Sequence, residues 1–198
     1  MVCVCGGQEG EYRDLVEAFT DWTKKNCFLP NTPKTKELVV DFRISKTPCK
    51  SVCIEEEEME TVQSYKYLGV VLDNKLEWSA NIEAVYRRGQ SRLVFLRQLR
   101  SFNVCSDMLC MFYHTVIESA LFYAVVCWGR CTTEKNCKRL DKLVKMASSV
   151  IGRELDPLKT VVEQRMKRKL YSLMVNNKHP LHSILAGQMN SCSERLQD

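Results

Sequence analysis

The sequence lacks closely paired cysteines and a secretory leader, and each absence narrows the class of protein. None of the eleven cysteines forms a C-x2-C pair, so we expect no structural zinc. Their odd number also disfavours a fully paired secreted framework, and we therefore expect an intracellular compartment, cytoplasmic or nuclear. The segment Met1–Gly7 contains no basic residue and is too short for a signal peptide.

Acidic residues are scarce in the middle of the chain, although the overall composition is that of an ordinary globular protein. The chain has 198 residues, of which 45% are hydrophobic and 27% charged, with a net charge of +5. Between Ala80 and Arg153 there are only five acids. The basic residues of this segment are Arg87, Arg88, Arg92, Arg97, Arg100, Arg130, Lys135, Lys138, Arg139, Lys142, Lys145 and Arg153. This excess is compatible with binding nucleic-acid phosphates, but on charge alone a solvated basic helix face is the favoured interpretation.

The N-terminal part is predicted to combine one helix with short strands. Apolar residues recur every three or four positions between residues 8 and 26, which predicts an amphipathic helix. Its apolar positions are Tyr12, Leu15, Val16, Phe19 and Trp22. A proline-rich turn follows, and β-branched and aromatic runs predict strands over 37–44, 51–55 and 65–72. The acidic run 55–58 is interpreted as a solvated connection between strands rather than a magnesium site.

After Trp78 the apolar pattern becomes helical and stays so. It predicts helices over 79–102, 106–128, 134–151 and 157–176. Ser79 is expected to cap the first of these helices, Gly152 to end the third, and Asp156-Pro157 to begin the fourth. Gly89 leaves room for another element to approach closely.

The run from Met108 to Trp128 is long enough to span a bilayer. His114 and Glu118 lie inside it and are costly at membrane depth, so we expect a buried helix and no membrane partner.

The predicted fold class is α+β, a small antiparallel sheet followed by a mostly α-helical bundle. The predicted domains are 1–76, 77–153 and a C-terminal helix and tail over 154–198.

Six short motifs occur in a definite order along most of the chain, from about Tyr12 to His179. They are Phe19-Thr-Asp-Trp22, Asn31-x-x-Lys34-Thr35-Lys36-Glu37, Tyr67-Leu68-Gly69, Glu77-Trp78, the Arg/Leu alternation Arg92–Arg100, and Phe112-Tyr113 with Ile117-Glu118-Ser119 and Trp128-Gly129. This order resembles the end of the palm and the thumb of reverse transcriptases from non-LTR (LINE-type) retrotransposons.

The resemblance implies roles for particular residues. Lys34 is similar to the lysine of the palm turn called motif D, proposed to protonate the departing pyrophosphate. Tyr67, Leu68 and Gly69 resemble motif E, the primer grip, whose backbone meets the primer end. A surface lysine and an ordinary bulge are the alternatives for these two motifs. The helices from Ser79 to Gly152 resemble the thumb, and its candidate phosphate contacts are Arg88, Arg92, Arg97, Lys138, Lys142 and Lys145.

The same resemblance implies that the chemistry of the family is not carried by these residues. The family holds two Mg²⁺ ions partly on an Asp-Asp hairpin, and no two aspartates are adjacent in this sequence. In the family that hairpin lies just upstream of the matched region. We therefore expect a catalytically incomplete polymerase fragment with no metal or other cofactor, no small-molecule substrate, and an RNA or DNA template–primer as its partner.

Two alternatives remain open. The first is a basic helical module that binds nucleic acid and has no polymerase role. The second follows from the segment Arg87–Arg100, which resembles the short N-terminal region of AlkB-homologue tRNA-modifying proteins. The His-x-Asp…His iron triad and the glycine-rich methyl-donor loop of those proteins are not found in this sequence, so their activities are not expected.

Overall fold

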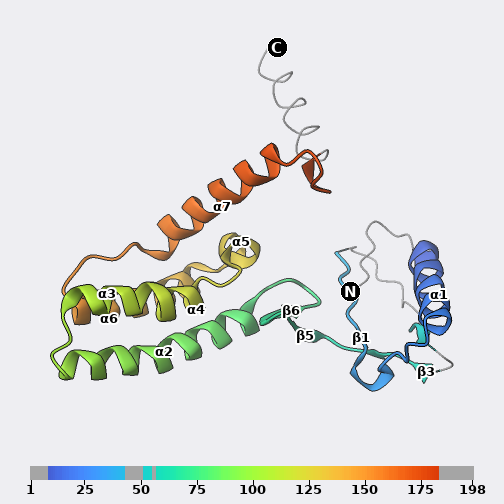
Figure 1. Ribbon diagram of the computed structural model, residues 1–198, viewed down its shortest axis with the longest axis horizontal. Helices are drawn as coiled ribbons and strands as arrows, with labels where there is room; N and C mark the ends of the chain where they lie inside the picture. The colour runs from blue at the N-terminus through green and yellow to red at the C-terminus, as the bar shows by residue number, and fades with distance from the viewer. Residues whose placement is uncertain (1–8, 43–50, 55–56, 183–198) are drawn as a thin grey trace, which may run out of the picture. The chain divides into compact units, whose positions relative to one another are not determined.

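A computed structural model of the protein describes residues 9–42, 51–54 and 57–182, and its contacts divide the chain into two compact units, Met1–Glu77 and Trp78–Asp198 (Figure 1). The predicted division into three domains, 1–76, 77–153 and a C-terminal helix and tail over 154–198, stays a prediction. The elements of the first unit are α1 (Glu9–Lys25), the 3₁₀ turn η1 (Thr32–Lys34), β1 (Lys36–Glu37), β2 (Cys53–Ile54), β3 (Glu57–Glu58), β4 (Glu60–Thr61), β5 (Ser64–Tyr67) and β6 (Val70–Asp73).

The first unit is built on α1, which packs one of its faces on a small apolar cluster. Val16 is buried there among Val52, Ile54 and Met59, with Tyr12 packed against the cluster. The remaining apolar positions predicted for this helix are open to solvent: Leu15, Phe19 and Trp22 are 50%, 47% and 53% exposed. The helix forms where its pattern predicts, but the short strands beside it cover only part of its apolar surface.

The described strands pair two by two rather than forming one antiparallel sheet. β1 pairs with β4 in parallel, whereas β2–β3 and β5–β6 are antiparallel. The strand predicted over 37–44 is wrong in extent, because residues 38–42 are not strand; 43 and 44 lie outside the described residues. Glu57 and Glu58 form β3 and are not a loop, while the predicted acidic positions 55 and 56 lie outside the described residues.

The second unit is a bundle of helices. Its elements are α2 (Ser79–Ser101), α3 (Ser106–Phe112), the π-helical segment η2 (Tyr113–Glu118), α4 (Ser119–Leu121), α5 (Val125–Trp128), the 3₁₀ turn η3 (Gly129–Cys131), α6 (Glu134–Ile151) and α7 (Leu158–Val175). Together with the small strand pairs of the first unit they confirm the α+β fold class. Helix α2 packs against α6 and against the α3–η2–α4 segment, and α7 packs against α5 and α6.

Gly89 of α2 marks the closest approach in this bundle. A Cβ atom at this position would lie 2.5 Å from Leu121 Cδ2 and 2.9 Å from Leu143 Cδ1. Both contacts are with the ends of buried leucine side chains, which would have to shift to admit a Cβ atom here. The close approach expected at this glycine is therefore confirmed, and it brings α4 and α6 together on the same side of α2.

Three details of the predicted helices are wrong. Ser79 is the first residue of α2, and the capping position is held by Trp78 in a left-handed conformation with φ of 62°. The helix predicted over 106–128 changes to π geometry at Tyr113 and breaks at Ala124, where φ is 51°. Asp156 does not cap the last helix: Leu158 donates its backbone N–H to Asp141 Oδ1 at 2.8 Å instead. By contrast, α6 has the predicted bounds and Gly152 ends it with φ of 79°.

The apolar stretch considered as a membrane span is bent. Within the described residues, no single helix combines the length and apolar character needed to cross a bilayer. The pair Ser106–Leu121 and Val125–Cys131 meets that requirement only jointly, with a bend of 46° between its two parts.

Candidate nucleic-acid interface

Helix α6 presents a line of lysines on the face opposite its buried residues. Lys138, Lys142 and Lys145 are exposed, and their spacing of four and three residues keeps them within about 60° of one another around the helix. The buried residues of α6 are Leu140, Leu143, Val144, Ala147 and Ile151. Lys138 pairs with Glu134 at 2.8 Å, and in the described part of the chain neither Lys142 nor Lys145 forms an ion pair. We call these three residues the lysine stripe.

The three arginines predicted on α2 lie on different sides of that helix. Arg88 and Arg97 are nine residues apart, which places them about 180° apart around the axis. Arg88 is half-buried and donates to the Ala84 carbonyl at 3.2 Å. Arg92 donates through Nη1 to the Val116 carbonyl at 2.7 Å, so it connects α2 with η2. Arg97 is exposed. The predicted set is thus divided between two flanks of the helix.

An ion-pair cluster fixes α6 against α2 beside the lysine stripe. Glu83 of α2 accepts from Arg139 of α6 at 2.9 Å and from Arg87 at 3.1 Å. The Arg139 guanidinium also lies 4.3 Å from the centre of the Tyr86 ring, a cation–π distance. Hydrogen bonds from Arg139 and then Arg87 hold the pKa of Glu83 below its ordinary value. Glu83 therefore remains a carboxylate at neutral pH and orients α6.

In the first unit, Asn31 builds the turn that carries Lys34. The Asn31 side chain accepts from the Lys34 N–H at 3.2 Å, while the Asn31 carbonyl accepts the Thr35 hydroxyl at 2.9 Å. This is the usual way in which an Asn side chain replaces a backbone partner in a tight turn. Lys34 itself is exposed. Its predicted motif D role stays a prediction.

Residues 67–69 form the tip of a β-hairpin rather than a strand with a glycine in its middle. Tyr67 pairs with Val70 across the β5–β6 ladder, and the two residues between them are the turn. Leu68 and Gly69 have φ values of 46° and 82°, as a two-residue turn of type I′ requires. The Leu68 side chain is 71% exposed. The predicted single strand is wrong, and the primer-grip role of this tip stays a prediction.

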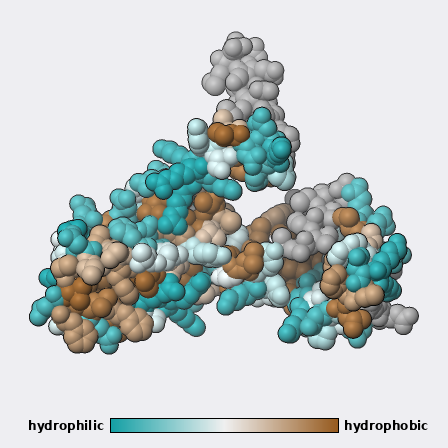
Figure 2. All heavy atoms as spheres, viewed as in Figure 1, coloured by the Kyte–Doolittle hydropathy of each residue, from teal (hydrophilic) through white to brown (hydrophobic). Residues whose placement is uncertain are grey.

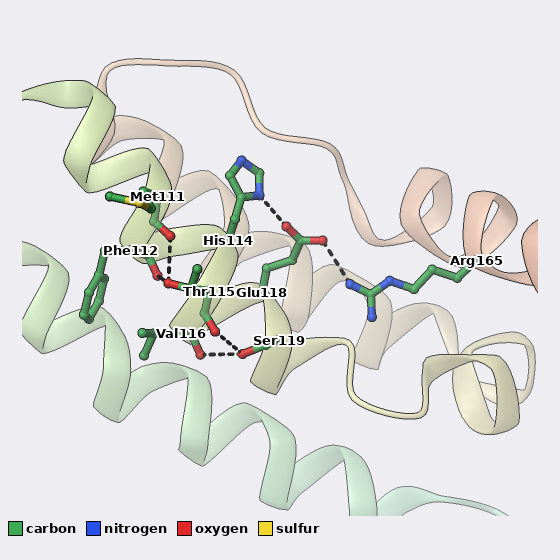
Figure 3. Close-up of polar contacts among 8 residues, drawn as sticks. All are labelled: Met111, Phe112, His114, Thr115, Val116, Glu118, Ser119 and Arg165. Carbon is green, nitrogen blue, oxygen red and sulfur yellow. Dashed lines mark hydrogen bonds and ion pairs between the residues drawn. The ribbon is translucent and has the colours of Figure 1, made fainter.

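The π-helical segment carries a polar network that the sequence analysis did not identify (Figure 3). Glu118 lies between two partners: His114 Nδ1 at 2.5 Å from one carboxylate oxygen and Arg165 Nη2 at 3.0 Å from the other. Thr115 and Ser119 turn their hydroxyls back onto carbonyls of the preceding turn, at 2.8 Å and 2.5 Å. Hydroxyls in the middle of a helix often make such bonds. The four-residue spacing of Thr115 and Ser119 is the feature of the sequence that could have indicated them.

The described residues contain no group of three or more His, Cys, Asp or Glu side chains that could hold a metal ion. The cysteines described as free thiols are Cys27, Cys53, Cys105, Cys110, Cys127, Cys131 and Cys137. The expectation that the protein takes no metal or other cofactor stays a prediction.

Comparison with known proteins gives two similarities. Residues 78–119, which run from the start of α2 to the start of α4, match the family described as alkylated DNA repair protein alkB homolog 8, N-terminal. A stretch of 119 residues is 25% identical to the RNA-directed DNA polymerase from mobile element jockey of Drosophila funebris. This stretch covers 59% of this chain and 13% of that polymerase. No solved structure matches.

Proposed function

We propose that this chain is the part of a LINE-type RNA-directed DNA polymerase that holds the template–primer, and that α6 contacts its phosphates. The observation that carries the proposal is the lysine stripe. Lys142 and Lys145 are exposed on one face of a helix whose other face is fixed to α2, so their ammonium groups can reach a phosphate backbone together. The 25% identity to the jockey polymerase supports the same lineage.

Bound phosphates would be recognised by charge and spacing rather than by base sequence. Each lysine that neutralises a phosphate releases condensed counterions, so affinity should fall steeply as salt is raised. Arg97 lies on the opposite flank of α2 from Arg88 and Arg92, so these three residues would meet different parts of a bound nucleic acid. In the first unit, Lys34 and the hairpin tip Tyr67–Gly69 would add further contacts to the template–primer.

The test measures binding of the full chain to a recessed primer–template duplex by fluorescence anisotropy over a range of salt concentrations. We expect the logarithm of affinity to fall linearly with the logarithm of salt concentration. Replacing Lys142 and Lys145 together by Gln should reduce the slope by about two, at roughly 0.9 per lost phosphate contact. The matched control replaces Lys75 and Lys66 of the first unit by Gln and should leave the slope nearly unchanged. A variant slope equal to that of the wild type would overturn the proposal.

The match over residues 78–119 supports a second candidate, a basic helical module that binds nucleic acid without a polymerase role. The two candidates differ in their substrate. A template–primer holder should prefer a recessed duplex to a single strand or a blunt duplex of equal charge, whereas a general module should bind by charge density alone. Equal affinity for the recessed and blunt duplexes would favour the second candidate.

A further inference from the structure

An open apolar groove lies between the C-terminal half of α2 and the α3–η2 segment, with a volume of about 390 Å³. Its lining residues are Arg92, Phe95, Gln98, Leu99, Phe102, Phe112 and Val116. Phe95 and Phe102 are 53% and 76% exposed, so large aromatic surfaces face solvent. Figure 2 shows apolar side chains gathered on the surface where the end of α2 meets α3. The volume falls within the range of small-molecule sites and has room for a planar ring.

The groove continues a line of arginines along α2. Arg88, Arg92, Phe95, Leu99 and Phe102 follow one another at steps of four, three, four and three residues, which places them on one side of the helix. The two arginines therefore precede the two exposed rings on the same flank. Phe95 and Phe102 are seven residues apart, or about 10.5 Å along the axis. The bond to the Val116 carbonyl fixes Arg92 at the edge of the groove.

The charge of the groove indicates which kind of molecule can occupy it. Arg92 is the charged residue of its lining, and no acidic side chain is among the described residues that line it. An occupant should therefore combine anionic groups, to meet Arg88 and Arg92, with flat aromatic surfaces, to meet Phe95 and Phe102. An unpaired strand of nucleic acid has both, since its phosphates are anionic and every base has a stacking face.

We infer that this groove binds unpaired bases of a nucleic-acid strand by stacking them on Phe95 and Phe102, while Arg88 and Arg92 hold the adjacent phosphates. The inference rests on the proposed function and adds a contact for bases to the phosphate contacts of the lysine stripe. Stacking of this kind tolerates any sequence, because it reads no base edge.

The test compares two oligonucleotides of about 12 nucleotides, a length that single-strand-binding domains cover. One is a thymidine homopolymer and the other an abasic strand with the same phosphates. We expect the full chain to bind the thymidine strand more tightly, by about 5- to 150-fold for each base that stacks on one of the two rings. Replacing Phe95 and Phe102 together by Ala should bring this ratio close to one. The control Val94→Ala, an exposed residue of the same helix outside the groove lining, should keep it.

The outcomes separate this inference from the proposed function. If the wild type binds both strands equally, with affinity that falls steeply with salt, the groove does not take bases and the proposed function stands. If the chain binds neither these strands nor the primer–template duplex, both are overturned. Sedimentation of each variant tests another occupant: a dimer that the Phe95/Phe102 replacement converts to a monomer would make the groove a contact between copies of this chain and would overturn the inference. Circular dichroism of the double variant confirms that it folds.

Discussion

Glu118 and Arg165 form an ion pair at 3.0 Å that connects the π-helical segment η2 to helix α7. Arg165 also donates to the Phe122 carbonyl at 2.8 Å, and its guanidinium lies 5.6 Å from the centre of the Phe122 ring. The Glu118 and Arg165 side chains are 21% and 34% exposed. A single arginine therefore joins a carboxylate, a carbonyl and a ring that belong to the end of the apolar α3–α4 segment.

Removing this arginine should loosen the docking of α7. Arg165→Met keeps most of the aliphatic stem but loses both hydrogen bonds and leaves Glu118 with His114 alone. Hydrogen bonds to charged groups contribute about 1.5–3 kcal/mol each when buried, but the pair is partly exposed and screened by solvent, so we expect a total loss of roughly 2 kcal/mol in the free energy of unfolding. Urea denaturation measures it. Arg168→Met, at an exposed position of the same helix, is the control, and equal losses in the two variants would contradict the assignment.

The close approach at Gly89 gives a second prediction. Gly89→Val would place side-chain atoms where Leu121 and Leu143 already lie, with the Cβ contacts at 2.5 Å and 2.9 Å. Overpacking of this kind costs about 1–3 kcal/mol, and a β-branched residue offers little gain in helix propensity to offset it. Thermal denaturation should show a lower Tm for Gly89→Val than for Gln90→Val, the exposed neighbour. A variant as stable as the wild type would show that the two leucines can repack.

The sequence predicted those parts of the fold that depend on local periodicity. In α6 a polar face alternates with Leu140, Leu143 and Val144 at the helical period, and the bounds of the helix are as predicted. The Leu68-Gly69 turn was missed because both residues must adopt positive φ, and Leu rarely does so. The predicted strand over 37–44 failed because strand pairing depends on partners that are distant in sequence.

The groove and the Glu118 network could not be predicted because both depend on contacts between residues that are distant in sequence. His114 and Glu118 were noted as costly residues inside an apolar run, and Arg165 is 47 residues away from Glu118, so no local pattern connects them. The exposed rings of Phe95 and Phe102 lie on the flank of Arg88 and Arg92, away from the buried stripe of α2, so its periodicity does not indicate what packs beside them. Only the packing of α3 and η2 against α2 decides which apolar residues of that helix are buried and which remain open to solvent.

The first turn of α7 is capped by a different residue from the one that the sequence pattern indicates. Asp156-Pro157 is the usual pattern of a helix start, yet Asp141 of α6 accepts the Leu158 N–H at 2.8 Å. Asp141→Ala should therefore cost about 1 kcal/mol, the typical cost of losing a capping acceptor. Asp156→Ala is the matched control and should cost less. Chemical denaturation of both variants decides, and a larger loss for Asp156→Ala would mean that the local signal caps the helix.

Glu83 should make the stability of the bundle depend on pH. Hydrogen bonds from Arg139 and Arg87 lower the pKa of Glu83 in the folded protein, so the folded state binds its proton less readily than the unfolded state does. The stabilisation is therefore complete above the ordinary glutamate pKa of 4.5 and is lost as pH falls through the lower folded value. We expect Glu83→Gln to lower Tm slightly at pH 7 and by less at pH 3, because the wild type has begun to lose this stabilisation below pH 4.5. Salt should shrink the difference at pH 7, because the cluster is solvent-exposed.

Glu154→Gln, at an exposed position of the same unit, controls for the loss of one negative charge. A Tm difference between Glu83→Gln and the wild type that stays constant from pH 7 to pH 3 would mean that Glu83 acts through packing and not through its charge.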